Sequence, residues 1–268
     1  MPKLVVSNLI KNHPLFLNIV KVNYRLDDAS IVASTGYNYL VFILSGDFKI
    51  KDEKGERYLS KYFLNSSSSY YELSARKGDT FLAIRLAPDK FHKITGSDLS
   101  KSDTRINLEQ VIPKEICHKL LLELQDCTNV NDHIKVLDKH LSTYYSKWSK
   151  PTAISTILEY ILKNNGMLNV TDLIEHFHVS HSTLNRHFKK ITGMTANKFL
   201  RLIRVNYIIR HIEQNATTNI LPLIENYKYY DYSHFSKNIK EFTGQTPKQF
   251  FRDKHSNMRE ILYKKIDF

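Results

Sequence analysis

The spacing of apolar residues changes near Pro113. Before it, short apolar or alternating runs rich in β-branched and aromatic residues lie between scattered glycines, a pattern typical of antiparallel strands. It predicts strands over 17–24, 39–44, 48–50, 70–73 and 81–86, with the polar segment 51–56 as a hairpin loop.

After Pro113 the apolar residues recur at helical spacing. One stripe contains Ile116, Leu120, Leu121 and Leu124, and a second contains Ile134, Leu137, Leu141 and Tyr145. We therefore predict two linker helices. Their apolar faces would pack on the sheet domain or on a second subunit, and packing within one chain is favoured.

The strongest signal is an internal repeat at a shift of 51 residues. The segment Phe188–Arg201 aligns with Ile239–Arg252, and further upstream Ser180 aligns with Asp231. The identical positions are Lys189, Thr192, Gly193, Thr195, Phe199 and Arg201 with Lys240, Thr243, Gly244, Thr246, Phe250 and Arg252. One supersecondary unit therefore occurs twice.

Each unit has the pattern of two helices joined by a tight turn. In the first, Thr171 is a suitable N-cap for a helix over 172–177, and Ser180 caps a helix over 181–191 that Gly193 ends. In the second, 220–227 and 232–242 take the same places. This is helix-turn-helix geometry, whose second helix fits a DNA major groove about 12 Å wide.

A helix over 195–211 connects the units, with its buried side formed by Phe199, Leu202, Ile203, Ile208 and Ile212. At about 1.5 Å per residue it spans roughly 25 Å. Because DNA repeats about every 34 Å, the two recognition helices would reach successive major grooves on one face. The narrow major groove of A-form RNA does not admit a helix.

Charge agrees with an anionic partner. The 268 residues contain 39 Lys and Arg against 27 Asp and Glu, a net charge of +12. The segment 180–210 carries no acid, and its basic residues are Arg186, Lys189, Lys190, Lys198, Arg201, Arg204 and Arg210. This run predicts an electrostatic footprint for nucleic acid, although a solvated basic helix face is the alternative.

Other features narrow the class. Cys117 and Cys127 are too few for a disulfide framework, no signal peptide is evident, and no apolar run approaches 18 residues. We expect a soluble cytoplasmic protein that does not enter a membrane.

The two motifs resemble those of the AraC-type (AraC/XylS) transcription regulators. The resemblance covers 155–252, and its most specific part is the second motif, from Tyr232 to the Gly-Gln-Thr-Pro sequence ending at Pro247. It implies an α+β protein with an N-terminal cupin-like antiparallel β domain, linker helices, and a C-terminal all-α domain with two helix-turn-helix units. The divisions we predict are 1–108 for sensing or dimerisation, 109–150 for the linker helices, 151–253 for DNA binding and 254–268 for a tail.

The resemblance also implies DNA-binding residues. They fall on Ser182, Asn185 and Arg186 in the first recognition helix and on Tyr232, Ser233 and Lys237 in the second. Arg186 can donate to guanine O6 and N7 and Asn185 can pair with adenine, each worth about 1–3 kcal/mol of discrimination. Lys189 and Lys190 suit phosphate contacts.

The sequence departs from the family pattern in the second unit. Ile224 and Lys228 stand where the family usually has a small residue and a glycine, and Lys237 replaces an arginine. Because lysine lacks the planar fork of arginine, base reading by the second unit is less secure, and a backbone clamp is the alternative.

The predicted partner is double-stranded DNA. RNA polymerase, a small-molecule effector and a second copy of the chain are further candidates that the resemblance leaves open, and no cofactor is expected. A cupin-type small-molecule enzyme in the N-terminal domain is the main alternative function, and a protein-binding adaptor is a third.

Candidate catalytic and metal-binding groups have little support in the sequence. The histidines at 176, 178, 181 and 187 straddle a turn, and the predicted β region holds only His13 and His92. Cys117 and Cys127 lie in or beside predicted amphipathic helices, where cysteine is usually a small buried apolar residue. A metal-dependent enzyme is therefore disfavoured.

Overall fold

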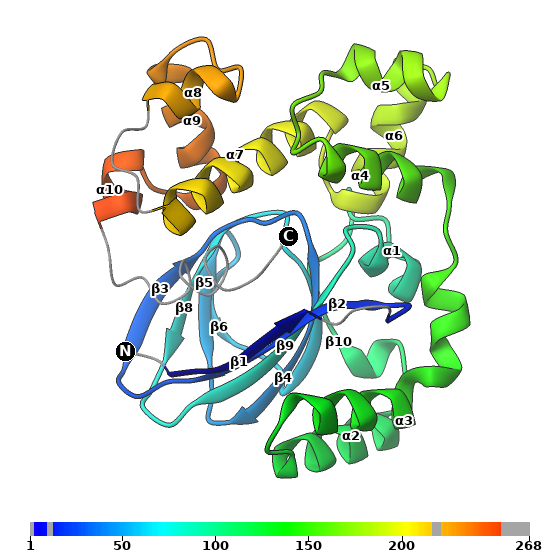
Figure 1. Ribbon diagram of the computed structural model, residues 1–268. Coiled ribbons are helices and arrows are strands. Elements are labelled where there is room, and N and C mark those ends of the chain that lie inside the picture. Colours follow the sequence, from blue (N-terminus) through cyan, green and yellow to red (C-terminus); the bar gives the residue numbers. More distant parts are fainter. Residues whose placement is uncertain (1–2, 10–12, 216–220, 253–268) are drawn as a thin grey trace.

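The computed structural model describes residues 3–9, 13–215 and 221–252, which form a β-sandwich with a helical layer across one end (Figure 1). The strands are β1 (Lys3–Leu9), β2 (Phe16–Asn23), β3 (Asp28–Val32), β4 (Asn38–Ser45), β5 (Lys49–Asp52), β6 (Gly55–Tyr58), β7 (Tyr62–Ser66), β8 (Tyr71–Ala75), β9 (Thr80–Leu86) and β10 (Arg105–Asn107). The helices are α1 (Lys90–Thr95), the 3-10 turn η1 (Leu108–Gln110), α2 (Lys114–Asp126), α3 (Val130–Ser149), α4 (Ala153–Lys163), α5 (Val170–Phe177), α6 (His181–Thr192), α7 (Ala196–Asn215), α8 (Leu221–Asn226), α9 (Tyr232–Thr243) and α10 (Pro247–Arg252).

The strands form two antiparallel sheets. The larger has the order β1-β2-β9-β4-β7-β10 and the smaller has the order β3-β8-β5-β6. In the centre of the larger sheet Leu40 pairs with Ile84 on one side and Leu64 on the other, and all three are buried. The observed α+β architecture, with an antiparallel β region first and helices after it, confirms the predicted fold class.

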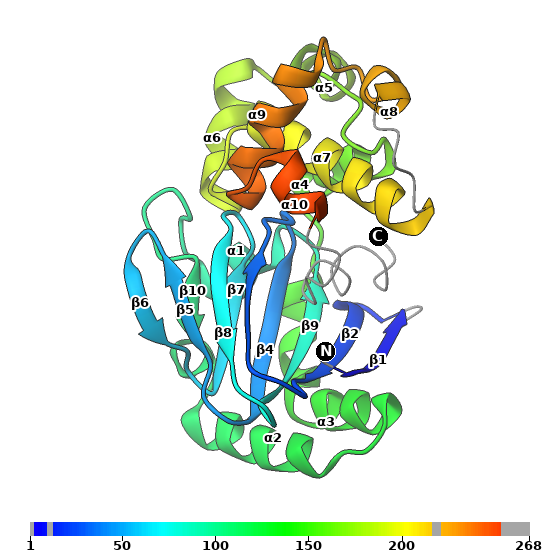
Figure 2. The same cartoon turned by 90° about the vertical axis from the view of Figure 1, so that its left-hand side faces the viewer.

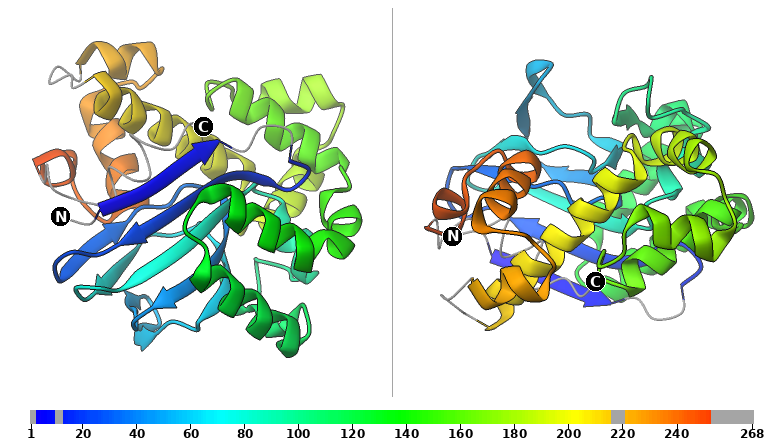
Figure 3. Two further views of the ribbon diagram at one scale, coloured as in Figure 1. Left: turned by 60° about the horizontal axis from the view of Figure 1, so that its bottom comes forward. Right: turned by 90° about the horizontal axis from the view of Figure 1, so that it is seen from above.

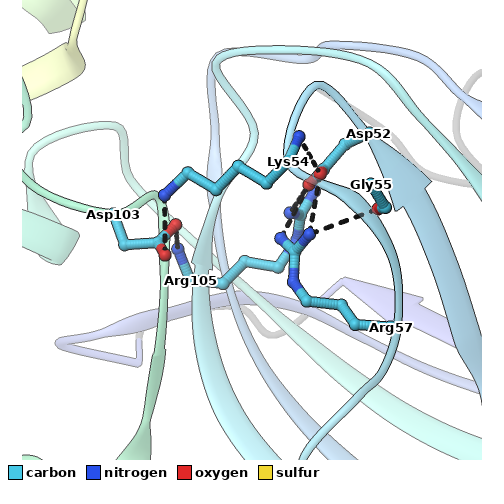
Figure 4. A network of polar contacts seen from close by, with 6 residues as sticks. All are labelled: Asp52, Lys54, Gly55, Arg57, Asp103 and Arg105. Atoms are coloured by element: carbon cyan, nitrogen blue, oxygen red, sulfur yellow. Dashed lines mark hydrogen bonds and ion pairs between the residues drawn. The ribbon is translucent and has the colours of Figure 1, made fainter.

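A polar clamp joins the two sheets at one edge (Figure 4). Asp52, at the end of β5, accepts hydrogen bonds from Arg57 at 2.7 and 2.8 Å and from Arg105 of β10 at 2.7 Å. The Arg105 guanidinium also stacks over the Tyr71 ring, 4.2 Å from its centre. Hydrogen bonds from Arg57 hold the pKa of Asp52 well below its usual range, so the carboxylate stays charged between the sheets.

The linker helices α2 and α3 pack against the larger sheet at the end away from the helical layer (Figure 2). Their buried residues Leu120, Leu124 and Leu137 join one apolar cluster with Phe42 and Leu82 of the sheet. The predicted apolar stripes therefore find their partner within the chain, as favoured.

Sequence spacing predicted the strands that became β2, β4, β5, β8 and β9, but it missed β1, β3, β6, β7 and β10. The five residues of β7 are all buried, so they show no alternation of exposed and buried positions. β10 has only three residues, too few for a period to appear. Strands of this kind are positioned by pairing with distant neighbours.

Candidate nucleic-acid interface

The first helix-turn-helix unit is α5, its turn and α6. Asn169, rather than the predicted Thr171, is the N-cap of α5, because Asn169 and Asp172 form a reciprocal capping box. The turn begins at His178, whose φ of 49° places it in the left-handed region. Ser180 then caps α6 by accepting a hydrogen bond from the Thr183 N–H, and Gly193 ends α6 with a φ of 74°, both as predicted.

The second unit repeats this plan with one extra residue in the turn. In both units a residue in the left-handed region follows the first helix, His178 in one and Lys228 in the other, which is a shift of 50. The N-caps of the recognition helices, Ser180 and Asp231, are 51 residues apart. The additional residue is Tyr230, which is 94% exposed, whereas the preceding Tyr229 is buried.

An alignment of the two units at a single shift of 51 residues does not show this insertion. The sequence does contain the signal, because the segments before the turn align at a shift of 50 and those after it at a shift of 51. Of the second unit's predicted first helix, 220–227, the structure has Leu221–Asn226, and residue 220 lies outside the described residues.

The connecting helix α7 runs diagonally between the two units and across the end of the sandwich (Figure 3). It has 20 residues and thus a length of about 30 Å. All five residues predicted for its buried side are buried: Phe199, Leu202, Ile203, Ile208 and Ile212. A helix buried along its length is a rigid spacer between the units.

Most of the predicted DNA-contacting side chains lie on the outside of the two recognition helices. On α6, Ser182, Arg186 and Lys189 are exposed at positions i, i+4 and i+7, which share one face of a helix. On α9, the exposed predicted residues are Tyr232, Ser233 and Lys237. These two faces can therefore approach a nucleic acid without rearrangement of the core.

Asn185 is the exception among the predicted reading residues. Its Oδ1 accepts a hydrogen bond from the Ala196 N–H at 3.1 Å, and its Nδ2 lies 3.2 Å from Nε2 of the His181 ring. The side chain thus caps the start of α7 and is half-buried. This placement favours a structural role in fixing α6 against α7.

Part of the basic run is also used within the protein. Lys198 and Arg201 form ion pairs with Glu241 of α9, at 3.2 and 2.8 Å. Arg204 donates to the carbonyl oxygens of Gly166 and Leu168. These three residues of the predicted electrostatic footprint therefore have partners within the protein, because acids and carbonyls distant in sequence meet them in the fold.

The β domain forms main-chain hydrogen bonds with the C-terminal ends of both recognition helices. The Leu99 N–H donates to the Lys190 carbonyl of α6 at 2.9 Å, and the Ser34 N–H donates to the Phe242 carbonyl of α9 at 2.9 Å. The last carbonyls of a helix have no partner within it, so these bonds supply one. Between them, Asn206 of α7 donates to the Thr35 carbonyl at 3.0 Å.

Glycine backbone allows close approach at this junction. Gly36 has a φ of 74° and lies against Phe199 and Leu202 of α7. The ring of Tyr70 lies so close to Gly244, the C-cap of α9, that a Cβ atom would meet it at 2.5 Å. The apolar core is continuous from the inside of the sandwich into the helical layer.

A buried polar cluster makes a further link between the domains. Asp89, just before α1, accepts hydrogen bonds from Ser155 of α4 at 2.7 Å and lies 2.6 Å from the Lys93 ammonium. Burial raises the pKa of Asp89, but the Lys90 charge and the hydrogen bonds from Lys93 and Ser155 more than offset it and hold the pKa below its ordinary value.

A cavity lies between the two sheets. Its wall is mostly apolar and includes Val20, Val41, Ile43, Phe48, Phe63, Leu73 and Phe81, and its polar groups come from Tyr39, Asn65, Ser67, Tyr71 and Arg85. The polar groups are close to the domain junction, since the Ser67 carbonyl accepts hydrogen bonds from the N–H groups of Thr35 and Gly36. A molecule bound in the cavity would therefore lie close to the loop of Thr35 and Gly36, which contacts α7.

The candidate metal ligands do not come together. Within the described residues, no group of three or more His, Cys, Asp or Glu side chains is arranged to hold a metal ion. His176 stacks on Tyr160 and His92 is bonded to the Ser97 carbonyl. Burial raises the pKa of Cys117 to about 12, which disfavours the reactive thiolate.

None of the described helices is long and apolar enough to cross a bilayer.

The fold and these surfaces define a class: a two-domain protein with a β-sandwich and a pair of linked helix-turn-helix units. Residues 173–253 match the family model of a helix-turn-helix domain. The match covers the C-terminal helical part of the chain and agrees with the helix-turn-helix motifs predicted there. A search of curated proteins finds no match.

Solved structures share the architecture over nearly the whole chain. ToxT from Vibrio cholerae O395 has a TM-score of 0.51 at 13% identity, covering 87% of this chain and 95% of ToxT. ToxT of strain SCE256 with a bound unsaturated fatty acid has a TM-score of 0.50 at 15% identity, covering 90% of this chain and 96% of that one. A third, ToxT bound to (E)-4-(8-methylnaphthalen-1-yl)but-3-enoic acid, has a TM-score of 0.50 at 13% identity, with coverage of 87% and 97%. The chain thus shares the fold of ToxT.

Proposed function

We propose that this protein is a sequence-specific transcription regulator that inserts α6 and α9 into adjacent major grooves of double-stranded DNA. The observation that carries the proposal is the pair of exposed polar faces on α6 and α9, held apart by the rigid 20-residue α7. Such a regulator acts where the chromosome is, in the cytoplasm of a bacterial cell.

The two units have unequal parts in this proposal. Arg186 reads a guanine, because its guanidinium is exposed on α6 and matches guanine O6 and N7. Ser182 lies beside it, and Lys189 contacts phosphate. In the second unit Tyr232, Ser233 and Lys237 lie along the groove, where a lysine places charge without the fork of an arginine.

The test is DNA binding by the full chain and by Arg186→Ala, on a duplex selected from a random pool. Loss of one bidentate pair costs about 1–3 kcal/mol, or roughly 5- to 150-fold in affinity, and relaxes selection at one base pair. Arg76→Ala is the matched control, because Arg76 is also exposed but lies on the β domain. An unchanged selected sequence for Arg186→Ala would refute the assignment, and so would wild-type binding that does not weaken with salt.

We also propose that DNA binding is controlled by an apolar carboxylic acid in the sandwich cavity. Support comes from the apolar wall, from Arg85 among the polar residues that line the cavity, and from the hydrogen bonds of the Ser67 carbonyl to Thr35 and Gly36 in the loop that contacts α7. Two structures of the same fold carry ligands of this kind, an unsaturated fatty acid and an aryl butenoic acid.

A melting-temperature measurement with an unsaturated fatty acid tests this second proposal, with the methyl ester of the same acid as control. The acid is expected to raise the melting temperature and to change DNA affinity, and the uncharged ester is not. Val41→Phe, which adds bulk to the cavity wall, should abolish the rise. Equal effects of acid and ester, or none from either, would count against it.

The same proposal includes the predicted domain divisions and a protein that is not an enzyme. It also includes contacts with RNA polymerase or with a second copy of the chain. The adaptor alternative makes the opposite prediction for DNA, because an adaptor would bind no duplex.

A further inference from the structure

A loop of the β domain lies beside the C-terminal end of the first recognition helix. It connects α1 to β10 and contains residues 97–104. Leu99 anchors it, because the Leu99 side chain is buried and its N–H donates to the Lys190 carbonyl at 2.9 Å. The position of this loop on α6 is therefore fixed by the fold.

A cleft opens between the loop and the helix. The loop contributes Asp98, Ser100 and Lys101, and α6 contributes Arg186, His187, Lys189 and Lys190. Four permanent cations thus face one carboxylate, which gives the cleft a net charge of +3 with the histidine neutral. A concave site lined by charges of one sign focuses the electric field and raises the local concentration of anions.

The single carboxylate is occupied by its own loop. Asp98 accepts hydrogen bonds from the Ser100 N–H at 2.9 Å and the Ser100 hydroxyl at 2.6 Å. Among the described residues, no ion pair within 4.0 Å joins Asp98 to the cations of the cleft. Asp98 therefore shapes the loop. The hydrogen bonds from Ser100, with a smaller effect of the Lys101 and Lys190 charges, hold its pKa below the ordinary value. Within the part of the chain that the structure describes, the side chains of the four cations donate no hydrogen bond, so their donors remain for another acceptor.

The cleft is continuous with the DNA-facing side of α6. Arg186 and Lys189 belong both to the cleft wall and to the exposed face of the recognition helix. When that face enters a major groove, the cleft lies beside the groove, where the nearest anions are backbone phosphates. Lysine ammonium groups are common phosphate ligands in protein–DNA complexes.

We propose that this cleft binds a backbone phosphate of the DNA strand flanking the groove that α6 enters, so that the β domain itself contacts DNA through Lys101. The inference rests on the proposed function, and it assigns a DNA contact to a domain outside the helix-turn-helix units.

The experiment measures DNA affinity of the full chain by fluorescence anisotropy over a salt series, for wild type, Lys101→Ala, Lys101→Glu and Lys101→Arg. One lost phosphate contact lowers the slope of log K against log salt by about 0.9. This change in slope corresponds to a DNA affinity about eightfold below that of wild type at 0.1 M salt, and the difference disappears towards 1 M salt. The loss should be the same for a selected site and for an unrelated duplex, greater in Lys101→Glu, and restored in Lys101→Arg.

Lys77→Ala is the matched control. Lys77 is an exposed lysine of the same domain in the β8–β9 turn, at the end of the sandwich away from the loop that contacts α7. Its removal changes the net charge equally, so any general effect of charge appears in both variants. A local contact appears in Lys101→Ala alone.

Other outcomes overturn the inference and are distinguishable from failure of the proposed function. If wild type binds no duplex, the proposed function fails and this contact fails with it. If wild type binds DNA but Lys101→Ala matches Lys77→Ala, the β domain does not contact the backbone and only this inference falls. If Lys101→Ala leaves the DNA salt slope intact but removes stabilisation by added pyrophosphate, the cleft is a site for a free phosphorylated compound instead.

Discussion

Gly36 is the point at which the effect of the domain junction on stability can be measured. It lies at the tip of the loop after β3, with a φ of 74°. A Cβ atom added there would be 3.1 Å from Leu202 Cδ2 and 3.1 Å from Phe199 Cε2, both on α7 and fully buried. Gly36→Ala therefore introduces backbone strain and a steric contact between the domains.

The two effects can be separated with Gly55→Ala. A non-glycine residue in the left-handed region costs about 1–2 kcal/mol. Gly55 has a φ of 94° and nothing within 4 Å of an added Cβ, so Gly55→Ala has only this backbone cost. Overpacking a buried site typically costs a further 1–3 kcal/mol, so Gly36→Ala should lose about 2–5 kcal/mol in total.

The measurement is urea unfolding of both variants, followed by far-UV circular dichroism and by fluorescence of Trp148, which is buried in the cluster of α2, α3 and the larger sheet. Gly36→Ala should shift the dichroism transition, dominated by helices, to lower urea than Gly55→Ala does. It should also separate that transition from the fluorescence transition, because the helical layer loses its support on the sandwich. Equal losses in the two variants would refute the idea that α7 packs tightly on this loop.

Three further predictions follow from the contacts. Asp52→Asn should lower the free energy of unfolding at pH 7, since it weakens the ionic bonds to Arg57 and Arg105. Because the folded pKa of Asp52 is depressed, its contribution in wild type is complete above about pH 5 and is lost progressively as pH falls towards the folded pKa. The deficit of the variant should therefore shrink in unfolding experiments at acid pH. Asn206→Ala removes the donor to the buried Thr35 carbonyl and should cost about 1–3 kcal/mol in thermal unfolding, whereas no loss would mean that water replaces the bond. Lys228→Gly should raise the melting temperature by relieving about 1 kcal/mol of left-handed strain, and a lower melting temperature would contradict the turn geometry.

Local signals in the sequence predicted the parts of this fold that depend on local physics. Helical spacing, cap residues and the closing Gly193 and Gly244 determine α6 and α9 within one or two residues. Even the error at the N-cap of α5 is local, because Thr171 and Asn169 are both good caps and the reciprocal bond with Asp172 decides between them.

Long-range contacts account for most of what sequence could not predict. Nothing near Asn185 indicates that its side chain caps α7, and nothing near Arg201 indicates Glu241, 40 residues later. The loop at Leu99 comes to α6 only because the sandwich and the helical layer dock. Exposure of predicted reading residues such as Arg186 follows from the local helical pattern, which the sequence shows. The partner of Asn185 follows from the packing of distant segments, which the sequence does not show.

The two hydrogen bonds from the β domain to the recognition helices limit which substitutions this sequence can accept. Both use main-chain atoms only, from Leu99 to Lys190 and from Ser34 to Phe242. A main-chain donor persists through every substitution except proline, and a main-chain carbonyl persists through all of them. The side chains around these bonds can therefore diverge widely while the two domains keep their attachment, and a proline at position 34 or 99 is the change that lineages of this protein should lack.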